Sequence, residues 1–168
     1  RIEAETEHRV DERNAFRVEW TYTPLTDGSL EIGYSIAPRI EAPWIPEVGL
    51  ELRTAAGLDT LRWLGLGPLE SYPNLKAAAL FGLWRLDARD AAGLRTDIRW
   101  AELTAASGAS VRVEGSSYVR MPAPGRLRAL AAVEGRPAAK FQRAEKAQDR
   151  LDAAPGAVFR GSLRLLVR

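Results

Sequence analysis

Apolar and polar side chains alternate strictly along Phe16-Arg17-Val18-Glu19-Trp20-Thr21-Tyr22-Thr23, with an apolar or aromatic residue at every even position. Successive side chains of a β-strand point to opposite faces of a sheet, so this pattern places four large side chains on one face. Residues 30–36 repeat the pattern, and Asp27-Gly28, which tolerates the positive φ of a tight turn, lies between the two runs. The sequence therefore predicts a β-hairpin.

Most of the remaining chain keeps this two-residue period. We expect further strands at residues 48–52, 61–64, 77–86, 96–103, 110–114, 127–133 and 158–167, and a charged strand near residues 1–10. Short strands separated by turns are typical of an all-β sandwich of packed antiparallel sheets. Residues 138–154 differ, because they are rich in helix formers and have a thin apolar stripe, so we expect a short surface helix or a loop there.

The composition predicts one globular domain over residues 1–168. With 46% hydrophobic residues, a chain of this length has enough apolar surface for one core without disulfides. Residues 1–10 begin with Arg1 and contain no hydrophobic signal segment, so we expect a piece excised from a longer chain. No apolar run approaches the roughly 20 residues of a membrane helix, so we expect no membrane partner. The compartment stays unassigned, with the cytoplasm favoured over export.

Few side chains suit metal or nucleic-acid chemistry. The chain has no cysteine and one histidine, His8, so we expect no metal and no cofactor. The net charge is only +2, and the arginines are interleaved with acidic residues, whereas nucleic-acid binders gather basic residues on one face. We therefore expect no nucleic-acid partner, and the sequence singles out no pair of catalytic carboxyl groups.

The least generic segment is Trp63-Leu64-Gly65-Leu66-Gly67-Pro68-Leu69-Glu70-Ser71-Tyr72-Pro73-Asn74-Leu75-Lys76. Its two glycines allow either unusual backbone angles or a close approach to other atoms, and its two prolines fix the path of the chain. We therefore expect an ordered loop after a strand. Glu70 and Tyr72 within it could bind sugar hydroxyls, or could bind the amides of the loop itself.

This segment resembles the motif Trp-Tyr/Phe-Gly-Arg/Leu-Gly-Pro-x-Glu-Asn-Tyr-Pro-Asp-Arg-Lys of the C-terminal, small-chain domain (domain 5) of β-galactosidases of glycoside hydrolase family 2. Two neighbouring stretches agree in order. Residues 45–52 are similar to a Leu-Pro-Arg-Val-Gly-Leu-x-Leu strand, and residues 92–100 are similar to Glu-Asn-Gly-x-Arg-x-Asp-x-Arg-Trp. The Asp27-Gly28 turn also stands where the family has one. The resemblance runs from about Tyr22 to Trp100 and fades beyond Val119.

The resemblance implies a galactose-mutarotase-like supersandwich that packs beside a catalytic (β/α) barrel and the preceding domains of a parent protein. The retaining hydrolysis would then belong to the barrel, and this chain alone would be inactive. The family's domain begins upstream, so the chain would be only its later part and would leave sheet edges open. Such edges favour association, and we expect contact with the missing half, with a neighbouring domain or with a second copy.

Departures from the motif remove hydrogen-bonding groups and charge. Leu66, Ser71, Asn74 and Leu75 replace the usual arginine, asparagine, aspartate and arginine, and Glu47 stands where an arginine is usual. A tryptophan late in the domain reaches the galactose pocket in related enzymes, and no residue here matches it. The parent could therefore act on another β-glycoside or have lost its activity.

The carbohydrate-binding candidates are Trp44, which stands between prolines outside any alternating run, and Glu70, Tyr72 and Arg95. The other tryptophans, Trp20, Trp63, Trp84 and Trp100, lie in strand-like runs, and for them we expect core packing. The leading hypothesis is a non-catalytic sandwich domain that edges a β-galactoside pocket. The alternatives are an independent carbohydrate-binding module and a structural module that associates through sheet edges.

Overall fold

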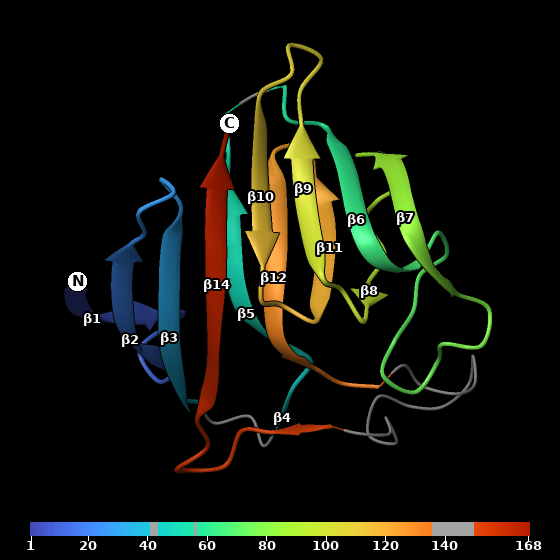
Figure 1. Cartoon of the computed structure of the whole chain (residues 1–168). Coiled ribbons are helices and arrows are strands. Elements are labelled where there is room, and N and C mark those ends of the chain that lie inside the picture. Colours follow the sequence, from blue (N-terminus) through green and yellow to red (C-terminus); the bar gives the residue numbers. More distant parts are fainter. Residues whose placement is uncertain (41–43, 56, 136–149) are drawn as a thin grey trace.

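The strands of the chain form two large antiparallel sheets that face each other (Figure 1). The computed structural model describes residues 1–40, 44–55, 57–135 and 150–168. The larger sheet contains, in spatial order, β1 (Ile2–Arg9), β2 (Ala15–Pro24), β3 (Leu30–Arg39), β14 (Phe159–Val167), β10 (Ser110–Glu114), β9 (Trp100–Thr104), β6 (Thr60–Gly67) and β7 (Leu80–Asp87). The smaller contains β5 (Glu47–Arg53), β12 (Arg126–Val133), β11 (Tyr118–Ala123) and β8 (Arg95–Thr96). The two-residue strands β4 (Trp44–Ile45) and β13 (Leu151–Asp152) pair separately.

The all-β sandwich predicted from the alternating pattern is confirmed. β2 and β3 form the expected antiparallel hairpin, with Val18 opposite Ile36 and Trp20 opposite Tyr34. Gly28 in the turn has a φ of 81°, which glycine adopts without steric cost. The sequence thus placed this hairpin and its turn correctly.

Three predicted segments differ from the structure. The run 96–103 is divided between β8 and β9, because the chain turns at Asp97, whose φ is 55°. The run 77–86 begins only at Leu80, and β11 was not expected at all. Of the predicted helix or loop at 138–154, residues 138–149 lie outside the described residues, and residues 151–152 form β13 instead of a helix.

The main core fills the space between the two sheets. The larger sheet contributes Leu61, Trp63, Leu103 and Val113, and the smaller sheet contributes Val119, Met121 and Leu127, all almost fully buried. A second cluster, formed mainly by β3, β5 and β12 with Val18 and Leu163, continues this core under the hairpin. Side chains of both sheets therefore interdigitate as in other aligned sandwiches.

The expectation that four tryptophans pack in the core is correct for Trp63 and wrong for Trp100. Trp63 is fully buried, whereas Trp20 and Trp84 are partly buried and pack at the margins of the core. Trp100 lies opposite Leu64, one residue out of phase with the core-facing Trp63 and Gly65, so its ring is on the outer face of the sheet. The guanidinium of Arg112 covers that ring at 4.3 Å from its centroid.

The two sheets differ in width. In Figure 1, β1, β2 and β3 extend beyond β5, the end strand of the smaller sheet on that side. The described larger sheet ends at β1 and β7, and the smaller ends at β5 and β8. Within the described ranges, no helix has both the length and the apolar character needed to cross a bilayer.

Candidate functional site

The loop of residues 68–76 begins where β6 approaches two other parts of the chain. A Cβ on Gly65 would lie 2.7 Å from Cδ1 of Ile98, and a Cβ on Gly67 would lie 2.7 Å from ring atoms of both Trp63 and Trp84. Neither glycine has a positive φ. Of the two roles that the sequence left open for these glycines, the structure shows close approach.

The loop is attached to the strand β8 by buried polar contacts. The amide of Ser71 donates to the carbonyl of Leu94 at 2.9 Å, and the amide of Thr96 donates to Oγ of Ser71 at 3.1 Å. The hydroxyls of Ser71 and Thr96 lie 3.0 Å apart, and both side chains are fully buried. At the far end of the loop, Nζ of Lys76 binds the carboxylate of Asp97 at 2.9 Å. These contacts hold the loop against the sandwich.

Arg95 faces inward from β8. Its guanidinium lies over the ring of Trp63, 5.3 Å from the centroid, and its Nη1 donates to the carbonyl of Leu94 at 3.1 Å. Burial lowers the pKa of Arg95, and the nearby charge of Glu70 opposes this shift. A Cβ on Gly93 would come within 2.7 Å of Nη1 of Arg95 and 2.9 Å of Cβ of Glu70, so both side chains border this glycine.

Tyr72, in the middle of the loop, lines a cavity of about 460 Å³. Its other lining residues come from the beginning of β5, from β11 and from the end of β12 with the two residues that follow it: Pro46, Glu47, Arg120, Val133, Glu134 and Gly135. Glu47 pairs with Arg120 at 3.3 Å, and burial raises the pKa of Glu134. The cavity therefore combines an aromatic ring with hydrogen-bond donors and acceptors, a combination that suits a small polar ligand.

Trp44 lies in β4 and is partly buried. The guanidinium of Arg150 covers its ring at 4.8 Å from the centroid, so the exposed aromatic platform expected from the sequence is partly covered. The charge of Arg150 also opposes the rise in the pKa of the Glu134 carboxyl group. The backbone amide of Glu134 donates to the carbonyl of Pro46 at 2.9 Å. Trp44 is thus linked to the cavity of Tyr72 through Arg150 and Glu134. Glu70 and Arg95 lie beside Gly93, and Tyr72 is close enough to Arg95 to affect its pKa.

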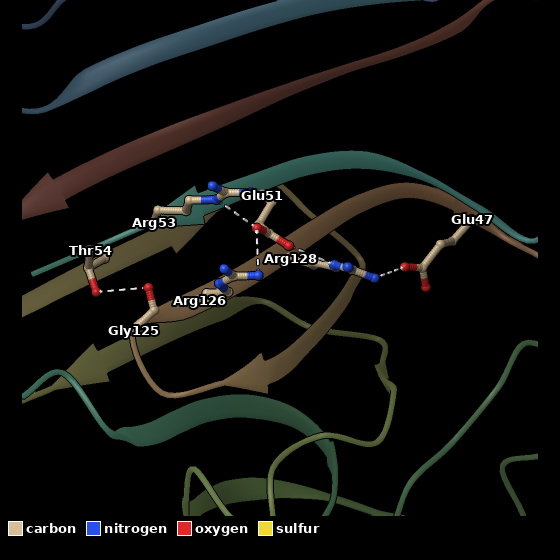
Figure 2. Close-up of polar contacts among 7 residues, drawn as sticks. All are labelled: Glu47, Glu51, Arg53, Thr54, Gly125, Arg126 and Arg128. Atoms are coloured by element: carbon tan, nitrogen blue, oxygen red, sulfur yellow. Dashed lines mark hydrogen bonds and ion pairs between the residues drawn. The ribbon is translucent and has the colours of Figure 1, made fainter. Parts of the chain in front are cut away.

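A network of arginine and glutamate side chains covers the outer face of the smaller sheet (Figure 2). Arg128 of β12 binds both Glu47 and Glu51 of β5, with 3.0 Å between its Nε and the Glu51 carboxylate. Arg53 binds Glu51 at 3.0 Å, and Arg126 approaches it at 3.8 Å. Hydrogen bonds from Arg128 and Arg53 lower the pKa of Glu51. The glutamate at position 47 is therefore compensated by arginines of neighbouring strands.

This network was not predicted from the sequence. The available signal was the glutamates Glu47 and Glu51 in one strand and the arginines Arg126 and Arg128 in another, but matching them requires the register of β5 with β12, in which Glu51 lies opposite Arg128. In the described part of the chain, no group of three or more His, Cys, Asp or Glu side chains could hold a metal ion.

Comparisons with known proteins agree on one family. Residues 2–154 match the profile of the family described as "Beta galactosidase small chain". The β-galactosidase of Priestia megaterium is 33% identical over 112 residues, which cover 61% of this chain and 11% of that protein. The β-galactosidase of Photobacterium profundum is 37% identical over 92 residues (48% and 9%), and that of Lactococcus lactis is 32% identical over 89 residues (53% and 9%). The chain thus spans about a tenth of the length of these relatives.

Proposed function

The chain belongs to the β-galactosidase small-chain family, and from this membership we propose that it is a non-catalytic β-sandwich domain of a longer, β-galactosidase-like glycoside hydrolase. In this proposal the domain packs beside the catalytic barrel and the preceding domains of the parent protein, and it borders the sugar pocket. The hydrolytic chemistry resides in the barrel.

The observation that carries this proposal is the burial of three polar residues in the stretches that resemble the family, Ser71, Arg95 and Thr96. The hydroxyls of Ser71 and Thr96 bind each other, the amide of Thr96 donates to Oγ of Ser71, and Arg95 is stacked on Trp63. Groups that are already bonded within a buried region stabilise a fold better than they bind a ligand. The motif therefore supports a role in shaping and fixing the loop.

The electrostatics of the outer face support the same role. Retaining glycosidases require two carboxyl groups about 5 to 5.5 Å apart, one of them with a raised pKa so that it can act as an acid. Glu47 and Glu51 are bound by arginines, and the pKa of Glu51 is lowered. A carboxyl group held ionised in this way suits an ion-pair network.

An assay on a chromogenic β-galactoside tests the proposal. We expect the isolated 168-residue chain to show no turnover above buffer, and we expect the intact parent protein to hydrolyse the substrate. The parent lacking these residues should lose activity together with thermal stability. Appreciable turnover by the isolated chain, or full activity and stability of the truncated parent, would contradict the proposed role.

A second candidate function is sugar binding by this domain, and the cavity beside Tyr72 favours it. Glu47, Arg120 and Glu134 supply hydrogen-bond donors and acceptors to the cavity that the ring of Tyr72 lines. Arg150, which covers the ring of Trp44, connects that second aromatic residue to Glu134. Calorimetric titration with galactose and lactose tests this candidate, with Tyr72→Ala as the variant and Tyr22→Ala as a control for the loss of one tyrosine. Heat that disappears only in Tyr72→Ala would support a binding module.

A further inference from the structure

A groove of about 500 Å³ follows the free edge of β5. Six consecutive residues of this strand, 47–52, line one side of the groove. Consecutive residues of a strand point alternately to its two faces, so a groove that contacts all six follows the backbone edge instead of a single face. The other side is lined by alternate, core-facing residues of the hairpin together with His8: Phe16, Val18, Trp20, Tyr22, Ile32 and Ile36.

The edge of β5 has no strand partner on this side among the described residues. β5 pairs with β12 and is the last strand of the smaller sheet. Such an edge presents backbone N–H and C=O groups that can pair with another strand. β1, β2 and β3 extend past this edge in the larger sheet, so the sandwich has one layer here where it has two elsewhere (Figure 1).

The floor of the groove continues the hydrophobic core. Val18, Ile36 and Val48 are buried members of the second core cluster, and Phe16 and Trp20 are only partly buried beside them. An apolar surface that is continuous with a core is characteristic of permanent interfaces, which resemble a core cut in half. The groove therefore fits a stable structural partner better than a transient one.

We propose that this groove is filled by one extended strand from the part of the parent protein outside residues 1–168. The strand pairs with the edge of β5 and places alternate apolar side chains on β2 and β3, as in strand addition to an open sheet edge. The inference rests on the proposed function, since it takes a longer parent for granted. The relatives support this occupant, because nine tenths of their length lies outside the matched region.

Photo-crosslinking in the intact parent tests the occupant. The crosslinking amino acid p-benzoylphenylalanine replaces Tyr22, which faces the groove, or Glu19, an exposed residue on the opposite face of the same strand. After irradiation and digestion, mass spectrometry identifies the attached peptide. We expect the variant with the crosslinker at position 22 to attach to a peptide outside residues 1–168. The variant with the crosslinker at position 19 should not form this product. A product within residues 1–168, a product with a second copy, or no product overturns the inference.

Hydrogen exchange without any substitution provides a second measurement. We expect amides of residues 47–52 to exchange at least about tenfold more slowly in the intact parent than in the isolated chain. Equal exchange in both overturns the inference. Neither readout depends on turnover, so an inactive parent with the expected crosslink contradicts only the proposed function. An active parent without the crosslink contradicts only the strand in the groove.

Discussion

The guanidinium of Arg95 lies over the indole ring of Trp63, and both residues are nearly inaccessible, with exposed fractions of 3% and 0%. Nε of Arg95 has no hydrogen-bond partner among the residues that the structure describes. The contact therefore joins a charge whose burial costs free energy to a large hydrophobic side chain. Substitutions of the two residues should change the free energy of unfolding by different amounts.

We expect Trp63→Ala to lower the free energy of unfolding by about 3 to 5 kcal/mol, because it leaves a large cavity in the core. Arg95→Met should change it by less than about 1 kcal/mol, because replacing a buried charge by an apolar side chain of similar length is often neutral. Urea unfolding followed by circular dichroism measures both values. If Arg95→Met costs as much as Trp63→Ala, the stacked cation is essential to the fold.

The hydroxyl pair of the loop provides a second test. Ser71→Ala leaves the buried amide of Thr96 without its acceptor and the Thr96 hydroxyl without its partner, so we expect a loss of about 1 to 3 kcal/mol in the free energy of unfolding. Thr96→Val should cost a similar amount, and the double variant should cost less than the sum of the two, because both remove one contact. Additive losses would show that the two hydroxyls do not act as a pair.

The sequence predicted local structure better than the arrangement of strands. The hairpin of β2 and β3 was predictable because a strict alternation and a turn dipeptide lie next to each other in the chain. β14 lies between β3 and β10 although β3 is more than 100 residues away from it in the chain, and alternation carries no information on strand order. β11 was missed because Pro122 disrupts its strand pattern, and its pairing with β12 shifts register beyond Arg120.

In the candidate site, too, local features were predictable from the sequence and contacts between distant segments were not. The two glycines of β6 marked an ordered loop, but only the tertiary structure shows that they admit Ile98, Trp63 and Trp84. Alternation also misled at Trp100, since it reports that a side chain faces one side of a sheet but not which side meets the core. The ion pairs of Arg128 depend on the irregular register between β5 and β12, which no local pattern encodes.

The network on the outer face predicts a measurable stabilisation. Arg128→Met removes hydrogen bonds to both Glu47 and Glu51 while keeping the apolar stem, so we expect a loss of about 1 kcal/mol in the free energy of unfolding. The control is Glu3→Gln, which breaks the exposed pair between Glu3 and Arg1 and should change stability by less than about 0.5 kcal/mol. Equal effects of the two variants would contradict a special contribution of the network.

Asp27 predicts a dependence of stability on acid pH. Hydrogen bonds from the hydroxyl and amide of Ser29, with a further contribution from Arg164, lower the pKa of Asp27 from 3.8 to about 2. A pKa that is lower in the folded state stabilises the protein above pH 3.8, and this stabilisation is lost as the pH falls toward 2. The difference in unfolding free energy between the wild type and Asp27→Asn should therefore shrink across this range.

Urea unfolding between about pH 5 and about pH 2.5 measures this difference. Glu12→Gln, in the turn between β1 and β2, controls for the removal of one negative charge from an exposed turn of the same sheet. A difference for Asp27→Asn that stays constant with pH, or that matches the change seen in Glu12→Gln, would show that the hydrogen bonds in the turn do not hold the carboxylate in its ionised form.

The close approach of β6 to the tryptophans predicts a specific effect of a single methyl group. A Cβ on Gly67 would lie 2.7 Å from ring atoms of Trp63 and Trp84, so Gly67→Ala must displace both rings. We expect a loss of about 1 to 3 kcal/mol in the free energy of unfolding and a shift of the tryptophan emission maximum. Gly28→Ala is the matched control, because its Cβ would meet nothing within 4 Å and its φ of 81° alone causes strain. That control should lose stability by about 1 to 2 kcal/mol without any change in tryptophan emission. If Gly67→Ala leaves the emission spectrum unchanged as well, close approach to the two rings is not the reason for a glycine at the end of β6, and its presence there needs another physical cause.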